Sequence, residues 1–242
     1  MARSPTTRPL SRRLLLAGLG ASAALGGVRG QGSGEPPVDV QLVLGVDASG
    51  SVSERRFQLQ QQGYVDAFRN PRVIKAIQSG LTGGIAVTMY QWTGPRLQRP
   101  VFGWTRISDA ASADALAGRL ERSPRMLFGG GTSISGAIDY GANLFAACPF
   151  PSTRRVIDIS GDGANTSGRM VTDARDEAVA KGIVINGLPI LAIEFDLDRH
   201  FLEEVIGGPG AFMIAAKDFE SFGEAIARKL VQEISALPSR AG

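Results

Sequence analysis

The sequence has little of the chemistry on which most zinc and nucleophile sites depend. It contains one cysteine, Cys148, and one histidine, His200, in 242 residues. A single cysteine excludes an internal disulfide, even in an oxidising compartment. One cysteine and one histidine are also too few for an ordinary zinc site. The two residues lie far apart in the chain, so we do not expect them to pair as nucleophile and base.

The net charge is small once the start of the chain is set apart. The formal charge is +3, but the first thirty residues hold five arginines and no acidic residue. Removing those five from the 26 basic residues leaves 21 bases against 23 acids, so the rest of the chain is mildly acidic. Nucleic acids and anionic membranes are bound by basic surfaces, and we expect neither as a partner.

The first thirty residues contain an apolar segment, 14–25, that is too short for a membrane span of roughly twenty residues. It follows the pair Arg12 and Arg13 and precedes small residues near Gly30, as in a bacterial export signal. The arginine pair indicates the twin-arginine type, with an ordinary Sec signal as the alternative. We predict an export signal over 1–30, a periplasmic or secreted bacterial protein, and no stable membrane span after signal removal.

The remaining chain is long enough for one well-buried domain. Residues 31–37 are rich in Gly, Ser and Pro and predict a tether, followed by a domain over 38–237 and a tail over 238–242. Strand patterns alternate with helical patterns, which predicts a doubly wound, mostly parallel α/β sheet with helices on both faces and one short antiparallel edge strand. The strands are expected at 40–46, 84–92, 98–105 (the edge strand), 156–160, 183–191 and 211–216.

The run Asp47-Ala48-Ser49-Gly50-Ser51 follows the first of these strands. Open α/β sheets bind ligands at the carboxyl ends of their strands. One carboxylate and two hydroxyls are suitable oxygen ligands for magnesium or a similar cation. The alternative is structural: the aspartate caps the next helix beside serines in a tight turn. This stretch alone favours neither.

Two further loops carry small oxygen-bearing residues among glycines. Thr132 lies in the loop 128–135 before a predicted helix, and Asp162 follows the strand 156–160. If all three loops lie at the carboxyl edge of the sheet, their oxygens converge on one point. The sequence therefore predicts a site for a divalent cation, magnesium first, with manganese or calcium as alternatives. The predicted ligands are Asp47, Ser49, Ser51, Thr132 and Asp162.

With these motifs in order, the chain resembles the von Willebrand factor type A (vWA) domain and its metal-ion-dependent adhesion site (MIDAS), over essentially all of 38–237. The resemblance implies a vWA/Rossmann-like fold. It also implies that the two serines and the threonine approach the metal, while the aspartates commonly act through water. The stretches 159–165 and 182–190 look like a group of exported bacterial vWA-like proteins whose activity is not established.

The chemistry of such a site favours binding over catalysis. Neutral hydroxyls leave the charge of a divalent ion partly unbalanced, so the ion attracts an Asp or Glu carboxylate from a partner protein. We expect a protein-binding module and not an enzyme. One alternative is a structural subunit whose metal braces the loops. Another is a magnesium-dependent phosphatase-like hydrolase, which would need a second aspartate where this chain has Ser49.

Four other acidic residues are interpreted as structural. Asp158 lies inside an apolar strand and needs a partner there. The candidates are Arg154 and Arg155, and a position behind the metal is the alternative. The other three, which are assigned to a solvated turn before a helix without a metal role, are Glu194, Asp196 and Asp198.

Overall fold

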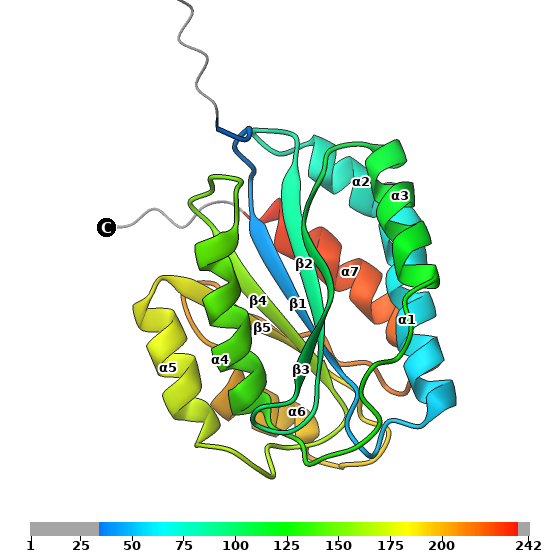
Figure 1. Ribbon diagram of the computed structural model, residues 1–242, viewed down its shortest axis with the longest axis vertical. Coiled ribbons are helices and arrows are strands. Elements are labelled where there is room, and N and C mark those ends of the chain that lie inside the picture. The colour runs from blue at the N-terminus through cyan, green and yellow to red at the C-terminus, as the bar shows by residue number, and fades with distance from the viewer. Residues whose placement is uncertain (1–33, 237–242) are drawn as a thin grey trace, which may run out of the picture. The chain divides into compact units, whose positions relative to one another are not determined.

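The computed structural model describes residues 34–236, so the predicted export signal (1–30), the start of the tether and the tail (238–242) lie outside the described residues. Within that range, five strands form one sheet in the order β3-β2-β1-β4-β5 (Figure 1). Only β3 runs antiparallel to its neighbour in this described sheet. The predicted doubly wound, mostly parallel sheet with an antiparallel edge strand is confirmed. The strands are β1 (Gln41–Asp47), β2 (Ile85–Trp92), β3 (Gln98–Ile107), β4 (Arg155–Gly161) and β5 (Ile183–Pro189).

The central strand is β1, which pairs with β2 on one side and β4 on the other. All seven of its residues are buried, as expected for a parallel strand covered on both faces. Successive side chains point to opposite faces, so Leu42 and Leu44 join one apolar core while Val43 joins the other. The carboxyl end of β1, at Asp47, is therefore held by packing on both faces of the sheet.

Helices cover both faces of the sheet (Figure 1). One face is packed by α1 (Glu54–Arg69), α2 (Pro71–Gln78), α3 (Ala110–Glu121) and α7 (Phe222–Ser235). The other is packed by α4 (Ile134–Leu144), α5 (Val171–Ala180), α6 (Leu197–His200) and the π-helical turn Phe201–Val205 that continues α6. Within the described residues, no helix is both long and apolar enough to cross a membrane.

The helix breaks follow local chemistry. Between α1 and α2, the side chain of Asn70 accepts a hydrogen bond from the backbone N–H of Arg72, and Pro71 is the first residue of α2. Proline is tolerated there because the first N–H groups of a helix have no partner within it. At the end of α5, Gly182 has a φ of 71°, a left-handed conformation that favours glycine. Each break therefore lies at a residue whose local chemistry ends or begins a helix.

The predicted strand over 211–216 is wrong. This segment touches β5 and its continuation only through single bridges, at Met213 and at Ala216. The backbone N–H of Phe212 donates to the side chain of Asn186 at 2.9 Å, so it is not available for a regular ladder of backbone hydrogen bonds. The preceding Gly208-Pro209-Gly210 also interrupts extended structure, because both glycines have positive φ. The described sheet consequently ends at β5.

Candidate metal site

Asp47 joins two of the three predicted loops. Its Oδ1 accepts a hydrogen bond from the backbone N–H of Ser49 at 2.7 Å, and its Oδ2 accepts one from the backbone N–H of Asp162 at 3.3 Å. The residue that caps α1 is Ser53, whose hydroxyl accepts from the backbone N–H of Arg56. The alternative in which Asp47 caps this helix is therefore wrong, and Asp47 instead ties the loop after β1 to the loop after β4.

The hydroxyl groups of the first loop lie against the carboxylate of the second. The Ser51 hydroxyl donates to Asp162 Oδ1 at 2.6 Å, and the hydroxyl oxygens of Ser49 and Ser51 are 3.1 Å apart. Asp47, Ser49 and Asp162 are buried, whereas Ser51 is exposed. These four residues thus form one continuous group of oxygens that reaches the surface at Ser51.

Thr132 lies beside this group without a hydrogen bond from its hydroxyl to any described residue. Its Oγ1 is 3.8 Å from the position that a Cβ would take on Gly163, the residue after Asp162. Its carbonyl accepts the backbone N–H groups of Thr166 and Ser167, at 2.8 and 3.1 Å, which holds it against the β4 loop. The structure therefore brings four of the predicted ligands into direct contact and places the fifth next to them.

The helix that follows the Thr132 loop, α4, packs closely at Gly136, in its first turn, against Pro95 in the connection between β2 and β3. A Cβ on Gly136 would lie 2.8 Å from the carbonyl oxygen of Pro95 and 2.9 Å from its Cα. We expect Gly136→Ala to lower the free energy of unfolding by about 1–3 kcal/mol, because backbone atoms must move to admit the methyl group. Urea unfolding measures this loss.

The matched control is Gly118→Ala on α3, where a Cβ would approach nothing closer than Arg122 at 3.4 Å. This substitution is expected to leave stability unchanged or to raise it by up to about 1 kcal/mol, since alanine favours helix more than glycine does. Equal losses in the two variants would contradict a close approach at Gly136.

The burial of the Asp47 and Asp162 carboxylates is electrostatically unfavourable. Burial, together with the negative charge of Asp162, raises the pKa of Asp47 to about 7. Burial also raises the pKa of Asp162. Asp162 Oδ2 is buried and accepts no hydrogen bond from the described residues, and the nearest guanidinium nitrogen, on Arg56, is 4.0 Å away. An unpaired buried carboxylate oxygen is unfavourable, and a divalent cation beside it would neutralise both acids.

The types of side chain at the site also indicate which metal ions it could bind. Among residues 34–236, no group of three or more His, Cys, Asp or Glu side chains is placed to hold a metal. A cation here would therefore depend on hydroxyl oxygens as well as carboxylates. Such an all-oxygen set suits a hard ion such as magnesium, manganese or calcium. The residues present fit a divalent cation.

Glu194 was assigned to a solvated turn, and that interpretation is wrong. Its Oε2 accepts the backbone N–H of Ala164 at 2.8 Å, and its Oε1 is 3.4 Å from the position of a Cβ on Gly163. Its charge contributes to the raised pKa of Asp162. No local motif marks this residue. Its place shortly after β5 was the available signal, because that loop shares the carboxyl edge of the sheet.

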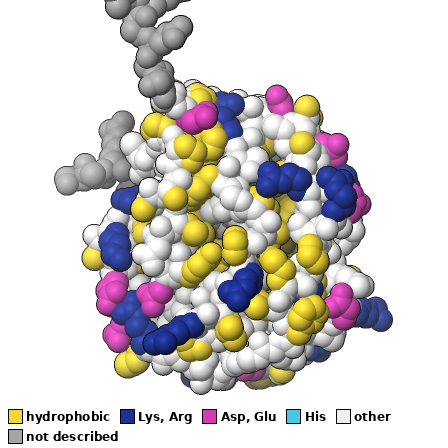
Figure 2. All heavy atoms as spheres, in the orientation of Figure 1, with side chains coloured by type: hydrophobic (Ala, Val, Ile, Leu, Met, Phe, Trp, Pro, Cys, Tyr) yellow, Lys and Arg dark blue, Asp and Glu magenta, His cyan; other side chains and the backbone are white. Residues whose placement is uncertain are grey.

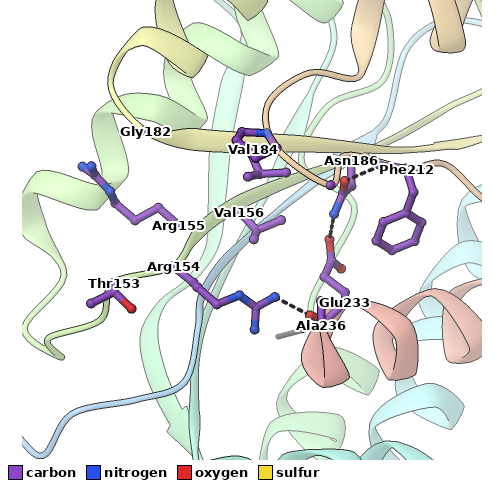
Figure 3. Close-up of a pocket in the computed structure, with 12 residues that line it drawn as sticks. Thr153, Arg154, Arg155, Val156, Gly182, Val184, Asn186, Phe212, Glu233 and Ala236 are labelled. Atoms are coloured by element: carbon purple, nitrogen blue, oxygen red, sulfur yellow. Dashed lines mark hydrogen bonds between the residues drawn. The ribbon is translucent and has the colours of Figure 1, made fainter. Parts of the chain in front are cut away.

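Asp158 forms the expected internal ion pair, but with a different partner. Its Oδ1 is 2.8 Å from Nζ of Lys229 on α7, and both side chains are fully buried. The guanidinium of Arg154 donates instead to the carbonyl of Glu233 at 2.7 Å (Figure 3). That of Arg155 donates to the carbonyl of Lys181. The two predicted arginine partners are therefore wrong.

Glu233 and Asn186 complete this buried network. Glu233 Oε1 lies 3.4 Å from Lys229 Nζ and accepts the side-chain N–H of Asn186 at 2.7 Å. A cavity of about 460 Å³ adjoins the network over Val156 and Val184 (Figure 3). The two ion pairs of Lys229 and the bond from Asn186 to Glu233 connect α7 to β4 and β5, while Asp158 Oδ2 and Glu233 Oε2 accept no hydrogen bond from the described residues.

The order of strands and helices gives this chain the fold of von Willebrand factor type A domains, and the Asp-x-Ser-x-Ser loop, Thr132 and the later Asp-Gly lie at the carboxyl edge of its sheet. The chain belongs to the family described as "Protein of unknown function (DUF1194)", whose model matches residues 37–238. A comparison with curated proteins gives no significant match.

Solved structures with the same fold include three proteins of low sequence identity. Proximal thread matrix protein 1 (PTMP1) from the mussel byssus is 14% identical with a TM-score of 0.61, over 84% of this chain and 49% of that one. The pilus adhesin SpaC from Lactobacillus rhamnosus GG is 15% identical with a TM-score of 0.58, over 81% and 30%. A von Willebrand factor type A protein from Catenulispora acidiphila is 14% identical with a TM-score of 0.55, over 82% and 43%.

This chain thus spans about half the length of PTMP1 and less of the other two. At these identities the similarity establishes the fold. Another structure of PTMP1 is described as having a zinc occupied MIDAS motif; it is 15% identical with a TM-score of 0.58, over 82% of this chain and 46% of that one.

Proposed function

We propose that this protein is an exported, metal-dependent protein-binding module whose divalent cation is completed by an Asp or Glu carboxylate of a partner. The observation that carries the proposal is Asp162 Oδ2, a buried carboxylate oxygen without a hydrogen bond from the described residues, beside the hydroxyls of Ser49 and Ser51. The residues that would hold the ion are Asp47, Ser49, Ser51, Thr132 and Asp162.

The roles of these residues follow from their contacts. Both oxygens of Asp47 already accept backbone N–H groups, so its main task is to position the two loops. Ser49, Ser51 and Thr132 supply neutral oxygens, which leave part of the ion's charge available to an incoming carboxylate. Ser51 is exposed, so a partner can approach on its side.

The comparisons support metal-dependent binding and do not identify a partner. PTMP1 has been crystallised with zinc in its MIDAS motif, and SpaC is described as a pilus adhesin. For this chain we propose magnesium as the first choice, because its donors are all oxygens. Because an export signal is predicted over 1–30, we propose that the binding partner lies in the periplasm or outside the cell.

Thr132→Ala tests the binding function. Capture of a partner from a bacterial periplasmic extract is expected in magnesium and is expected to be lost in EDTA or with the Thr132→Ala protein. The melting temperature in the absence of metal should change little, because the Thr132 hydroxyl donates to no described residue. The control is Thr105→Ala on β3, whose hydroxyl bonds to the nearby Gly103 carbonyl.

Two results would argue against the proposal. Capture that is equally strong in EDTA would separate partner binding from the metal. Capture that survives Thr132→Ala, while magnesium no longer raises the melting temperature of that variant, would indicate a metal that only braces the loops.

A further inference from the structure

A groove of about 440 Å³ opens beside the candidate metal site. It is bounded by the start of α1 and by the loop that leads into α7, two helices that run side by side on one face of the sheet (Figure 1). Its apolar part is formed by Leu59, Leu191 and Phe219. Three basic residues also line it: Arg55, Arg56 and Lys217.

The groove is continuous with the candidate metal site through Arg56. The guanidinium of Arg56 donates to the Ser51 carbonyl at 2.8 Å and lies 4.0 Å from Asp162 Oδ2. The same side chain stacks over the ring of Phe219, with 5.2 Å from its Cζ to the ring centroid. A peptide segment of a partner that places one side chain at the metal site would therefore place its neighbouring residues in the groove, just past Arg56.

The charges of the groove favour an anion. Two acids also line it, but the Oδ1 of Asp218 accepts the backbone N–H of Ser221 at 2.8 Å. Glu220 lies 3.6 Å from Arg55, and both side chains are more than half exposed, so their attraction is weak. The amino-terminal end of α1, a helix of 16 residues, adds a positive dipole end at the same place.

We propose that the partner segment recognised here carries two acidic residues close in sequence, one that completes the metal and a second that lies in this groove against Arg55, Arg56 and Lys217. This inference rests on the proposed function. In an extended segment, residues i and i+2 point to the same side about 7 Å apart, so an acid-x-acid pattern can present both carboxylates to one surface.

The test compares two peptides on the full-length protein loaded with magnesium. The first, acetyl-Gly-Asp-Gly-Asp-Gly-amide, has two acids, and the second, acetyl-Gly-Asp-Gly-Asn-Gly-amide, has one. NMR titration is expected to show about threefold to fivefold tighter binding of the first peptide, the size of one or two exposed ion pairs. The difference should shrink at high salt, because exposed charges are screened.

Lys217→Glu is the informative variant, because Lys217 contacts none of the five predicted metal ligands in the described structure. It is expected to abolish the preference for the two-acid peptide while leaving magnesium affinity, measured by calorimetry with the metal alone, unchanged. The matched control is Lys75→Glu, the same charge change on the exposed surface of α2, which should leave the preference intact.

The outcomes separate this inference from the proposed function. Equal affinities for the two peptides, absence of binding of either in the low millimolar range, or a preference that survives Lys217→Glu overturns the groove as an acidic-segment site. Failure of the wild-type protein to bind magnesium overturns the proposed function itself.

Discussion

Magnesium is expected to stabilise this protein strongly, and EDTA is expected to reverse the effect. A ligand that binds only the folded state raises the free energy of unfolding by about 2.7 kcal/mol when its free concentration is 100 times its dissociation constant. Here the folded state brings the loops after β1 and β4 together and buries two repelling aspartates, while the unfolded chain has no such site. Urea unfolding at several magnesium concentrations measures the gain.

Asp162→Asn is expected to remove this response completely. The substitution nearly preserves the shape of the side chain but removes the charge that the cation would neutralise. Without metal, the variant is expected to be at least as stable as the wild type, because Asp47 no longer faces a second buried carboxylate.

The control for this substitution is Asp139→Asn, which removes an acid that pairs with Arg169 away from the site and should leave the magnesium response unchanged. A magnesium gain of the wild-type size in Asp162→Asn would exclude Asp162 as a ligand.

Replacement of Lys229 by methionine is expected to lower the free energy of unfolding by about 3–5 kcal/mol at neutral pH, the usual cost of leaving a buried charge without its partner. Lys229 is the cation between Asp158 and Glu233, and all three side chains are buried. Methionine keeps most of the apolar volume, so the loss reports the charge and not a cavity. Urea unfolding of variant and wild type measures it.

The pH dependence gives this prediction a second readout. Burial and the charge of Glu233 raise the pKa of Asp158 from 3.8 to about 7, and Lys229 opposes them. A raised carboxyl pKa means that stability falls as pH rises from 3.8 towards 7, where the folded state must release its proton. Lys229 lowers the pKa of Asp158, so its removal should raise that pKa further. The Lys229→Met variant should therefore lose more stability, relative to the wild type, at pH 8 than at pH 5.

A double variant, Lys229→Met with Asp158→Asn, should recover part of the loss, because one of the two unpaired charges is gone. A loss at pH 8 of less than about 1 kcal/mol, or no recovery in the double variant, would mean that the ion pair is unimportant for the fold.

The sheet could be predicted because its strands are continuous apolar runs, a pattern that depends only on local sequence. β1, β2, β4 and β5 are buried along nearly their whole length. The segment 211–216 shows that an apolar run alone does not establish a strand. Its apolar composition resembles a strand, but the bond from the Phe212 N–H to Asn186 is a tertiary contact that no local pattern reveals.

The same distinction holds for the candidate site. Asp47, Ser49, Ser51, Thr132 and Asp162 could be proposed because parallel topology places the ends of their strands at one edge. Lys229 could not be identified as the partner of Asp158, since it lies on α7 and meets β4 only after the helix packs on the sheet. Glu194 was missed for a related reason: its bond to Ala164 depends on the path of an irregular loop.

The central position of β1 also bears on how the protein folds. The bond between Asp47 and the N–H of Asp162 spans 115 residues, and β1 cannot complete its pairing until β4 is available. Contacts between such distant segments slow folding, because the entropy of closing a long loop is lost before the contacts add any stability. A cation held by both loops, as proposed, would therefore bind only chains that have completed this step, and metal binding would report completed folding.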